Sequence, residues 1–356
     1  MAKFGDLDAI KKLDGNDMFS KLIQFPDQIR SAISVGYEFI PSQILSGRIL
    51  NIVVAGMGGS AIGGDLARSY LSQDLKVPMM VHRDYALPGF VDENSLVIVA
   101  SYSGSTEETL SAYSEGKRKK AKIIVISSGG ELSLKAQQDG TPLIKIPEGF
   151  MPRAALGYLF FPILIALAKI GICSESKNML LNVADFLEGR IPLFLPGVDE
   201  KSNPAKSIAR KLYNRIPIIY SARKHYDAVS LRFKGQLSEN SKSLAFCNVF
   251  PELNHNEFVG FEKLAINEDK LIVLIIRDQN DYDSIRKRMD IVSEMLEERG
   301  IETLIIQSRG ELLLERIFSL IQLADFSSFY LAILNDCDPT PIDAIERLKR
   351  ELKNRS

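Results

Sequence analysis

Residues 49–60 read Ile-Leu-Asn-Ile-Val-Val-Ala-Gly-Met-Gly-Gly-Ser, an apolar and β-branched run that ends in glycines. Such a run predicts a strand buried on both faces, as in a parallel sheet. Further apolar runs follow at 77–82, 95–100 and 122–127. Segments of helical length lie between these runs, at 61–72 and 106–119. Because strands that alternate with helices indicate βαβ units, we expect the first half of the chain to form a doubly wound α/β lobe.

The same alternation returns in the second half of the chain. Apolar runs at 216–222, 244–249, 271–277 and 303–307 alternate with helical stretches at 226–240, 284–299 and 312–334. A segment rich in Pro and Gly, 191–204, separates the halves. We therefore predict an α/β protein of two doubly wound, flavodoxin-like lobes with parallel sheets. The expected domains are a helical lead-in at 1–45, a first lobe at 46–190, a second lobe at 191–335 and a C-terminal helix within 336–356.

Composition narrows the class of protein. The chain has 356 residues, a net charge of −1, 46% hydrophobic residues and 25% charged residues, as soluble globular proteins do. A balanced charge gives no global attraction to nucleic acid or membrane. Cys173, Cys247 and Cys337 are an odd and scattered set, which favours neither disulfides nor a zinc cluster. The first six residues lack the apolar core of a signal peptide, and the apolar run 154–168 is too short to span a bilayer. We expect a cytoplasmic protein without nucleic-acid or membrane partners.

Glycines dominate the loop after the first strand, Gly56-Met57-Gly58-Gly59-Ser60-Ala61. Glycines between a strand and a helix let backbone amides approach an anion closely. Three interpretations compete: a tight turn that binds nothing, a dinucleotide fingerprint with Asp84 on the ribose, and a phosphate or sugar-phosphate pocket.

The loop after the third strand, Ser101-Tyr102-Ser103-Gly104-Ser105-Thr106, carries four hydroxyl residues besides the tyrosine. Hydroxyls and helix amides together form a neutral cradle for a phosphate. The alternative is a capping box, with Ser103 or Ser105 as N-cap and Glu108 reaching back. Capping explains one hydroxyl and not four, and a dinucleotide fold needs no such loop, so the pattern favours a phosphate site.

This loop, with Glu107, Glu108 and Thr109 after it, resembles the phosphate loop of SIS (sugar isomerase) domains. Two such lobes in tandem are similar to the phosphoglucose isomerase superfamily, and the phrases below point to its archaeal-type branch, the bifunctional phosphoglucose/phosphomannose isomerases. The lead-in Ile23-Gln24-Phe25-Pro26-Asp27-Gln28 also resembles that family. The resemblance covers almost the whole chain. It implies a metal-independent aldose–ketose isomerase with no cofactor, whose phosphate site is Gly59, Ser60, Ser101, Ser103 and Thr106.

Proton transfer between neighbouring carbons needs a base, and a carboxylate with a raised pKa suits this. Gln236-Leu-Ser-Glu-Asn-Ser-Lys242 resembles the family's Q-L-N-E-N-A-K motif, with serines in place of its Asn and Ala. The match makes Glu239 the catalytic base, although by composition it is an ordinary surface glutamate. Pro152-Arg-Ala-Ala-Leu-Gly157 is similar to P-R-x-A-L-G, which implies that Arg153 lies against the enediol oxygens. The alternative interpretation of Arg153 is a solvent-exposed arginine at the start of a helix, with no catalytic role.

The phrase Phe250-Pro-Glu-Leu-Asn-His-Asn-Glu257 resembles F-P-E-L-N-H-N-E at every position. The match implies that His255 assists ring opening and is donated by the neighbouring subunit, so that the active unit is a homodimer. The segment from Asp338 resembles the family's C-terminal helix and implies that Lys349 also acts in ring opening. Arg347, Arg350 and Lys353 share that helix, and a charged solvated face is the alternative. In the family a threonine of this region is linked to mannose 6-phosphate, and Thr340 is the candidate.

The expected reaction interconverts glucose 6-phosphate, and mannose 6-phosphate, with fructose 6-phosphate through a cis-enediol. A non-catalytic phosphosugar regulator keeps the hydroxyl loop but needs neither Glu239, His255 nor Arg153. A nicotinamide-dependent dehydrogenase leaves the hydroxyl loop unexplained. An isomerase of another sugar phosphate, a pentose phosphate or an amino sugar, stays open.

Overall fold

The computed structural model describes Phe4 and residues 7–355, without the side chains of residues 7 and 353. Residues 1–3, 5–6 and 356 lie outside the described residues, as does most of the segment tested for a signal peptide. The chain divides into two compact units. One holds Gln24–Glu188 with Leu312–Glu315, and the other holds Met1–Ile23, Gly189–Glu311 and Arg316–Ser356. The helical lead-in is thus divided at residue 23, and the chain passes to the other unit at residue 189.

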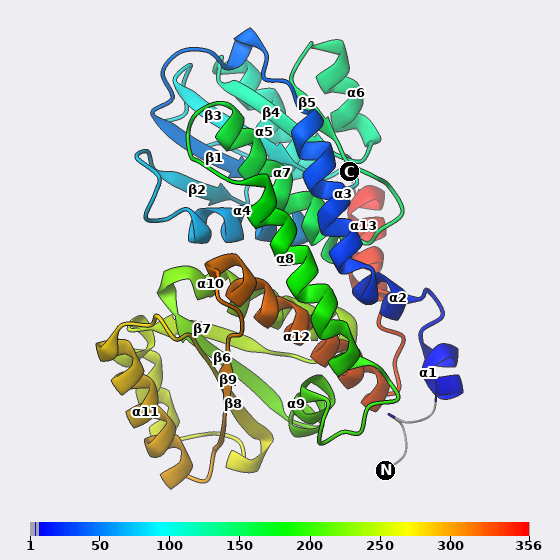
Figure 1. The fold of residues 1–356 in the computed structure, drawn as a ribbon, viewed down its shortest axis with the longest axis vertical. Coiled ribbons are helices and arrows are strands. Elements are labelled where there is room, and N and C mark those ends of the chain that lie inside the picture. Colours follow the sequence, from blue (N-terminus) through cyan, green and yellow to red (C-terminus); the bar gives the residue numbers. More distant parts are fainter. Residues whose placement is uncertain (1–3, 5–6, 356) are drawn as a thin grey trace. The chain divides into compact units, whose positions relative to one another are not determined.

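The first sheet has five parallel strands in the order β2-β1-β3-β4-β5. This is the flavodoxin-like order, so the predicted fold class is confirmed for this lobe. The strands, drawn from blue through cyan to blue-green in Figure 1, are β1 (Asn51–Ala55), β2 (Met79–His82), β3 (Ser95–Ala100), β4 (Lys122–Ser127) and β5 (Leu143–Lys145). β3 is buried at every position, as a strand covered on both faces must be.

Helices cover both faces of this sheet. On one face Val53, Val97 and Val125 pack with residues of α5 (Glu107–Arg118) and α6 (Gly130–Gln138). On the other face α4 (Gly58–Tyr70) lies against Val54 and packs on α7 (Leu156–Lys169), which in turn packs on α3 (Phe25–Glu38). Most of the apolar run 154–168 therefore lies in the buried helix α7. This doubly wound arrangement leaves the carboxyl ends of the strands free to carry loops.

The second sheet has four parallel strands in the order β7-β6-β8-β9, the same order without a fifth strand. Its strands are β6 (Ile216–Ala222), β7 (Phe246–Phe250), β8 (Leu271–Arg277) and β9 (Glu302–Gln307). Val273 and Ile275 pack with Val292 and Leu296 of α11 (Asp283–Glu298) on one face. α10 (Arg223–Ser241) runs from β6 to β7. The prediction of two α/β lobes with parallel sheets is confirmed.

The remaining helices are α1 (Leu7–Leu13), α2 (Met18–Ile23), α8 (Lys177–Arg190), α9 (Pro204–Leu212), α12 (Leu313–Leu334) and α13 (Asp343–Arg355). Short 3-10 turns stand at Gln43–Leu45, Pro152–Ala154, Ile191–Phe194, Glu252–His255, Glu257–Glu262 and Glu268–Lys270. Prolines mark the bounds of α3, which starts at Phe25 with Pro26 in its first turn and ends at Glu38, three residues before Pro41. Among the described residues α12 alone is long and apolar enough to cross a membrane, and it is buried within the protein as a core helix is.

Candidate active site

The loop after β1 is shaped by close backbone approach. Gly58 has φ +49° and begins α4, the left-handed conformation that glycine tolerates best. A Cβ on Gly59 would lie 2.6 Å from the carbonyl oxygen of Pro152. The start of α4 therefore lies directly against the 3-10 turn Pro152–Ala154, the turn that carries Arg153. Any residue larger than glycine at position 59 would separate these two site segments.

The two predicted phosphate loops meet at the carboxyl edge of the first sheet. The Ser60 hydroxyl, which is buried, accepts a hydrogen bond from the Tyr102 amide at 3.1 Å. The Ser101 hydroxyl donates to the Thr106 hydroxyl at 3.1 Å and accepts from the Gly104 amide at 3.1 Å. Ser60, Ser101 and Thr106 therefore gather, as the phosphate interpretation expects. The capping-box alternative is wrong, because the N-cap of α5 is Thr106 and not Ser103 or Ser105.

Tyr102 fixes this loop from within, a role that the sequence did not single out. Its hydroxyl donates to the carbonyl of Pro147 at 3.0 Å and accepts from the amide of Phe150 at 2.8 Å. Its carbonyl accepts from the Ser128 hydroxyl at 2.6 Å. Burial raises the pKa of Tyr102, so the phenol stays neutral. The position of Tyr102 between Ser101 and Ser103 was the sequence feature that could have indicated this structural role. The hydroxyl cradle is therefore held in shape by a network of hydrogen bonds.

Arg153 is buried, with a relative exposure of 3%, so the exposed-arginine alternative is wrong. The turn that carries it is held by the side chain of Gln28, which donates to the carbonyl of Ala154 at 2.7 Å and accepts from the amide of Gly157 at 2.8 Å. Gln28 comes from the lead-in phrase that resembled the family. A buried guanidinium acts in a low dielectric, where its effect on a nearby negative charge is large.

The motif around Glu239 lies on the last turns of α10, in the other unit. Its neighbours on the helix are anchored to α12: Gln236 donates to Asp325 at 2.8 Å, and Asn240 donates to Ser328 at 3.0 Å. Gln236, Asn240, Asp325 and Ser328 are buried, whereas the Glu239 side chain is partly exposed. The amide residues of the motif therefore hold the helix in place, while Ser238 and Glu239 between them are exposed and partly exposed.

The segment that carries Thr340 is tied to the same helix end. Lys242, in the left-handed conformation that ends α10, donates from its ammonium to the carbonyl of Glu239 at 3.0 Å and to that of Asp338 at 2.7 Å. The Thr340 amide donates to the Asp338 carboxylate at 2.8 Å. Lys242, the last residue of the motif, thus fixes the start of the C-terminal segment beside Glu239.

His255 stands at the end of the turn Glu252–His255, directly after β7, and is exposed. Among the described residues no hydrogen bond to its imidazole is found. The side-chain oxygen of its neighbour Asn254 is buried and unpaired within the same described part. Glu257 accepts from the hydroxyl of Tyr220 at 2.6 Å, which holds the far side of the phrase on the sheet.

Lys349 is exposed on α13, as are the alternatives Arg347 and Arg350. The side chain of Lys353 lies outside the described residues. The division of the chain assigns Glu239, His255 and Lys349 to one unit, and the phosphate loops with Arg153 to the other. Within the described chain no group of three or more His, Cys, Asp or Glu side chains has the geometry of a metal site.

The sheets, the hydroxyl cradle and its glycine loop define an SIS-domain protein. Residues 47–158 match the SIS domain, and residues 201–352 match the bacterial phospho-glucose isomerase C-terminal SIS domain. More particularly, the chain belongs to the family of bifunctional phosphoglucose/phosphomannose isomerases.

Relatives of that name support the assignment. The enzyme of Caldicellulosiruptor bescii is 42% identical over 337 residues, which cover 94% of this chain and 98% of that protein. The enzyme of Thermoplasma acidophilum is 38% identical over 86% of this chain and 91% of that protein. A D-glucosamine-6-phosphate 4-epimerase of Sulfolobus acidocaldarius is 32% identical over 63% of this chain and 68% of that protein. The C-terminal domain of glucosamine-fructose-6-phosphate aminotransferase from Francisella tularensis shares the fold, with a TM-score of 0.73, 15% identity, and coverage of 91% of this chain and 98% of that one.

Proposed function

We propose that this chain interconverts glucose 6-phosphate and mannose 6-phosphate with fructose 6-phosphate through a cis-enediol, without a metal. One observation carries the proposal: a hydroxyl cradle, in which Ser60 and Ser101 are buried, stands at the carboxyl edge of an SIS sheet, in a chain whose relatives are named bifunctional phosphoglucose/phosphomannose isomerases. Because the net charge of the chain is −1, a phosphate monoester must be bound by local groups and not by bulk charge. The neutral hydrogen-bond donors of the cradle are such groups.

In this mechanism the phosphate is held by Ser60, Ser101, Ser103, Thr106 and the amide of Gly59. These groups lie at the end of the sugar remote from the reacting carbons. Binding energy from the phosphate therefore orients the sugar and can be used in the transition state. Tyr102 and Ser128 contribute indirectly, since they hold the cradle in shape.

Glu239 takes a proton from one of C1 and C2 and returns it to the other. The negative charge that develops on the enediolate is stabilised by Arg153, whose burial strengthens the interaction. His255 and Lys349 open the sugar ring by exchanging protons with the ring oxygen and the hydroxyl. Thr340, beside the anchored end of α10, provides room for the C2 epimer, so that mannose 6-phosphate is also accepted.

The active unit in this proposal is a homodimer in which His255 reaches the partner's site. Two features support it. The imidazole is exposed, and apolar side chains face solvent at the start of the edge strand β7: Phe246 of the strand is 50% exposed, and Leu244, two residues before it, is 64% exposed. Bare apolar edges are normally covered. We further propose a cytoplasmic location, which the three free cysteines favour.

Mixing two inactive variants tests the shared site. His255→Ala and Glu239→Gln, co-refolded in equal amounts, give heterodimers with one complete site out of two. With random pairing the mixture should regain roughly a quarter of the wild-type activity, since isologous dimers place equivalent residues on both sides. If each site draws both residues from a single chain, no activity returns.

The reaction itself is tested with chelator-treated protein and separate fructose, glucose and mannose 6-phosphates. Conversion of both aldoses that survives the chelator and collapses in Glu239→Gln supports the full proposal. Turnover of glucose 6-phosphate alone removes the mannose claim. Binding without turnover identifies a regulator, and turnover of glucosamine 6-phosphate alone favours an activity like that of the Sulfolobus acidocaldarius relative.

A further inference from the structure

The second lobe repeats the strand order of the first, so each of its strands has a counterpart. β6 corresponds to β1, β7 to β2, β8 to β3 and β9 to β4. In such sheets ligands bind outside the carboxyl ends of the strands, where the strand order reverses. Ser101 is the first residue after β3 in the first lobe. The first residue after β8 in the second lobe is Asp278.

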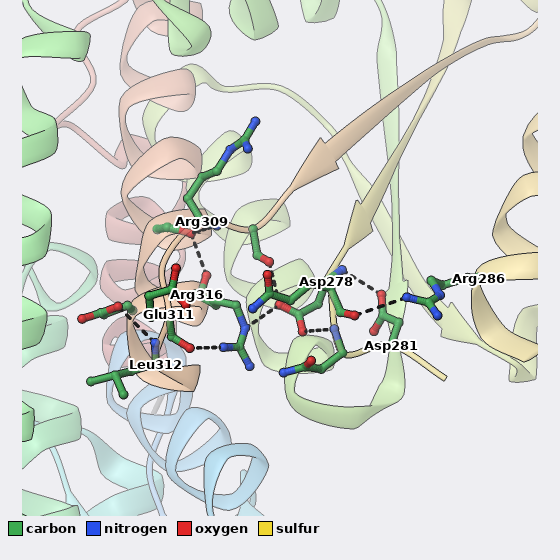
Figure 2. Close-up of polar contacts among 12 residues, drawn as sticks. Asp278, Asp281, Arg286, Arg309, Glu311, Leu312 and Arg316 are labelled. Carbon is green, nitrogen blue, oxygen red and sulfur yellow. Dashed lines mark hydrogen bonds and ion pairs between the residues drawn. The ribbon is translucent and has the colours of Figure 1, made fainter. Parts of the chain in front are cut away.

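The Asp278 carboxylate accepts hydrogen bonds from the kinds of donor that bind a phosphate ion in proteins (Figure 2). One of its carboxylate oxygens accepts from the Ser308 hydroxyl at 2.6 Å and from the guanidinium of Arg316 at 2.9 Å. The other accepts from the backbone amide of Asn280 at 2.9 Å. A hydroxyl, a guanidinium and a backbone amide are the donors that proteins present to phosphate oxygens. Ser308 directly follows β9, just as Ser128, which holds the first lobe's cradle in shape, directly follows β4.

The pair is enclosed. The side chains of Asp278 and Arg316 are 2% and 6% exposed. Arg316 is also held by the carbonyl of Glu311 at 2.5 Å. Burial by itself would raise the pKa of Asp278, but hydrogen bonds and the Arg316 charge lower it, so the carboxylate is ionised. The nearby Asp281 accepts from the Asp278 amide at 2.8 Å and is the acidic group that would oppose a further anion.

We infer that the Asp278 carboxylate occupies the place in the second lobe where a phosphate group would bind. It is a built-in anion that closes this edge and confines phosphosugar binding to the first lobe. The statement that phosphosugars bind in the first lobe rests on the proposed function, whereas the geometry at Asp278 does not depend on it. Replacing this carboxylate with the serine of the first lobe should therefore open a site for inorganic phosphate or a phosphate monoester.

Asp278→Ser tests the inference by thermal unfolding in phosphate and in chloride at equal ionic strength. Phosphate should raise the unfolding midpoint of Asp278→Ser by about 3–6 °C more than it raises that of the wild type. The control Asp278→Ser/Arg316→Met lacks the guanidinium and should lose this extra shift. Adding Asp281→Asn to Asp278→Ser should enlarge it, since a repelling charge is removed. Equal phosphate shifts in Asp278→Ser and the wild type would overturn the inference.

Two further measurements cover other outcomes. If Asp278→Ser does not fold in chloride, recovery on refolding in phosphate supports the inference, and no recovery in either salt contradicts it. Equilibrium dialysis of labelled phosphate should find one site per wild-type chain and none in Ser101→Ala. If Ser101→Ala still binds phosphate and Ser101→Ala/Arg316→Met does not, the second lobe already binds phosphate beside Arg316. That result would contradict the inference that Asp278 closes this site. A wild type that binds none would refute the phosphate cradle of the first lobe and leave the Asp278→Ser comparison decisive.

Discussion

Asp325 of α12 should control the position of Glu239 without touching substrate. Its carboxylate accepts from Arg232 at 2.7 Å and from Gln236 at 2.8 Å, and all three side chains are buried. Gln236 lies one helical turn before Glu239 on α10. Asp325→Leu removes both acceptors, and Asp325→Asn keeps the shape and one acceptor. We expect α10 to shift in the first variant and to move less in the second.

The structure sets the magnitudes. Asp325→Leu leaves a buried guanidinium without this partner, which costs about 3–5 kcal/mol of unfolding free energy. Asp325→Asn weakens charged hydrogen bonds and costs about 1–3 kcal/mol. A displacement of Glu239 near 1 Å should lower kcat roughly 10- to 100-fold. The KM for sugar phosphates should change little, because the phosphate loops belong to the other unit.

A matched double variant separates positioning from stability. Arg232→Met/Asp325→Leu replaces the ion pair by apolar side chains, which is often neutral for stability. It should regain most of the lost unfolding free energy, measured by urea denaturation, while kcat stays low because Gln236 still lacks its acceptor. Full recovery of kcat together with stability would refute the reasoning, as would an unchanged kcat in Asp325→Leu.

Three further predictions follow from single contacts. Ser60→Ala removes the acceptor of the Tyr102 amide, and an unpaired buried amide costs about 1–3 kcal/mol, so KM should rise roughly 5- to 100-fold; an unchanged KM would place the phosphate elsewhere. Gly59→Ala sets a Cβ 2.6 Å from the Pro152 carbonyl, so calorimetry should show a lower melting midpoint together with a lower kcat, whereas wild-type values would mean that the turn yields freely. Burial raises the pKa of Asp281 from 3.8 to about 6, so the native state holds this proton more tightly than the unfolded chain and loses stability as pH rises from about 4 to 6. Asp281→Asn should therefore gain about 1–2 kcal/mol relative to wild type between pH 4 and 7, and parallel curves would contradict this.

The sequence predicted the parts of the fold that depend on local pattern. Apolar β-branched runs located all strands except β5, which has three residues and lacks such a run. The helices α6, α8 and α9 were not predicted, although the apolar residues of α9, Ala205, Ile208, Ala209 and Leu212, recur at helical spacing and are buried. The hydroxyl loop was recognised from composition alone. The roles of Glu239, His255 and Lys349 came from resemblance, and they stay predictions.

What the sequence determined by itself was the class of fold and the chemistry of the first cradle, since both are written within short segments. Tertiary structure alone decided the partners of buried charges. Asp325 meets Gln236 across 89 positions, and Asp278 meets Arg316 across 38. In a sequence such residues look like solvated surface groups, because charge without burial carries no sign of a partner. Only packing removes water from them, and the removal of water is what makes a specific partner necessary.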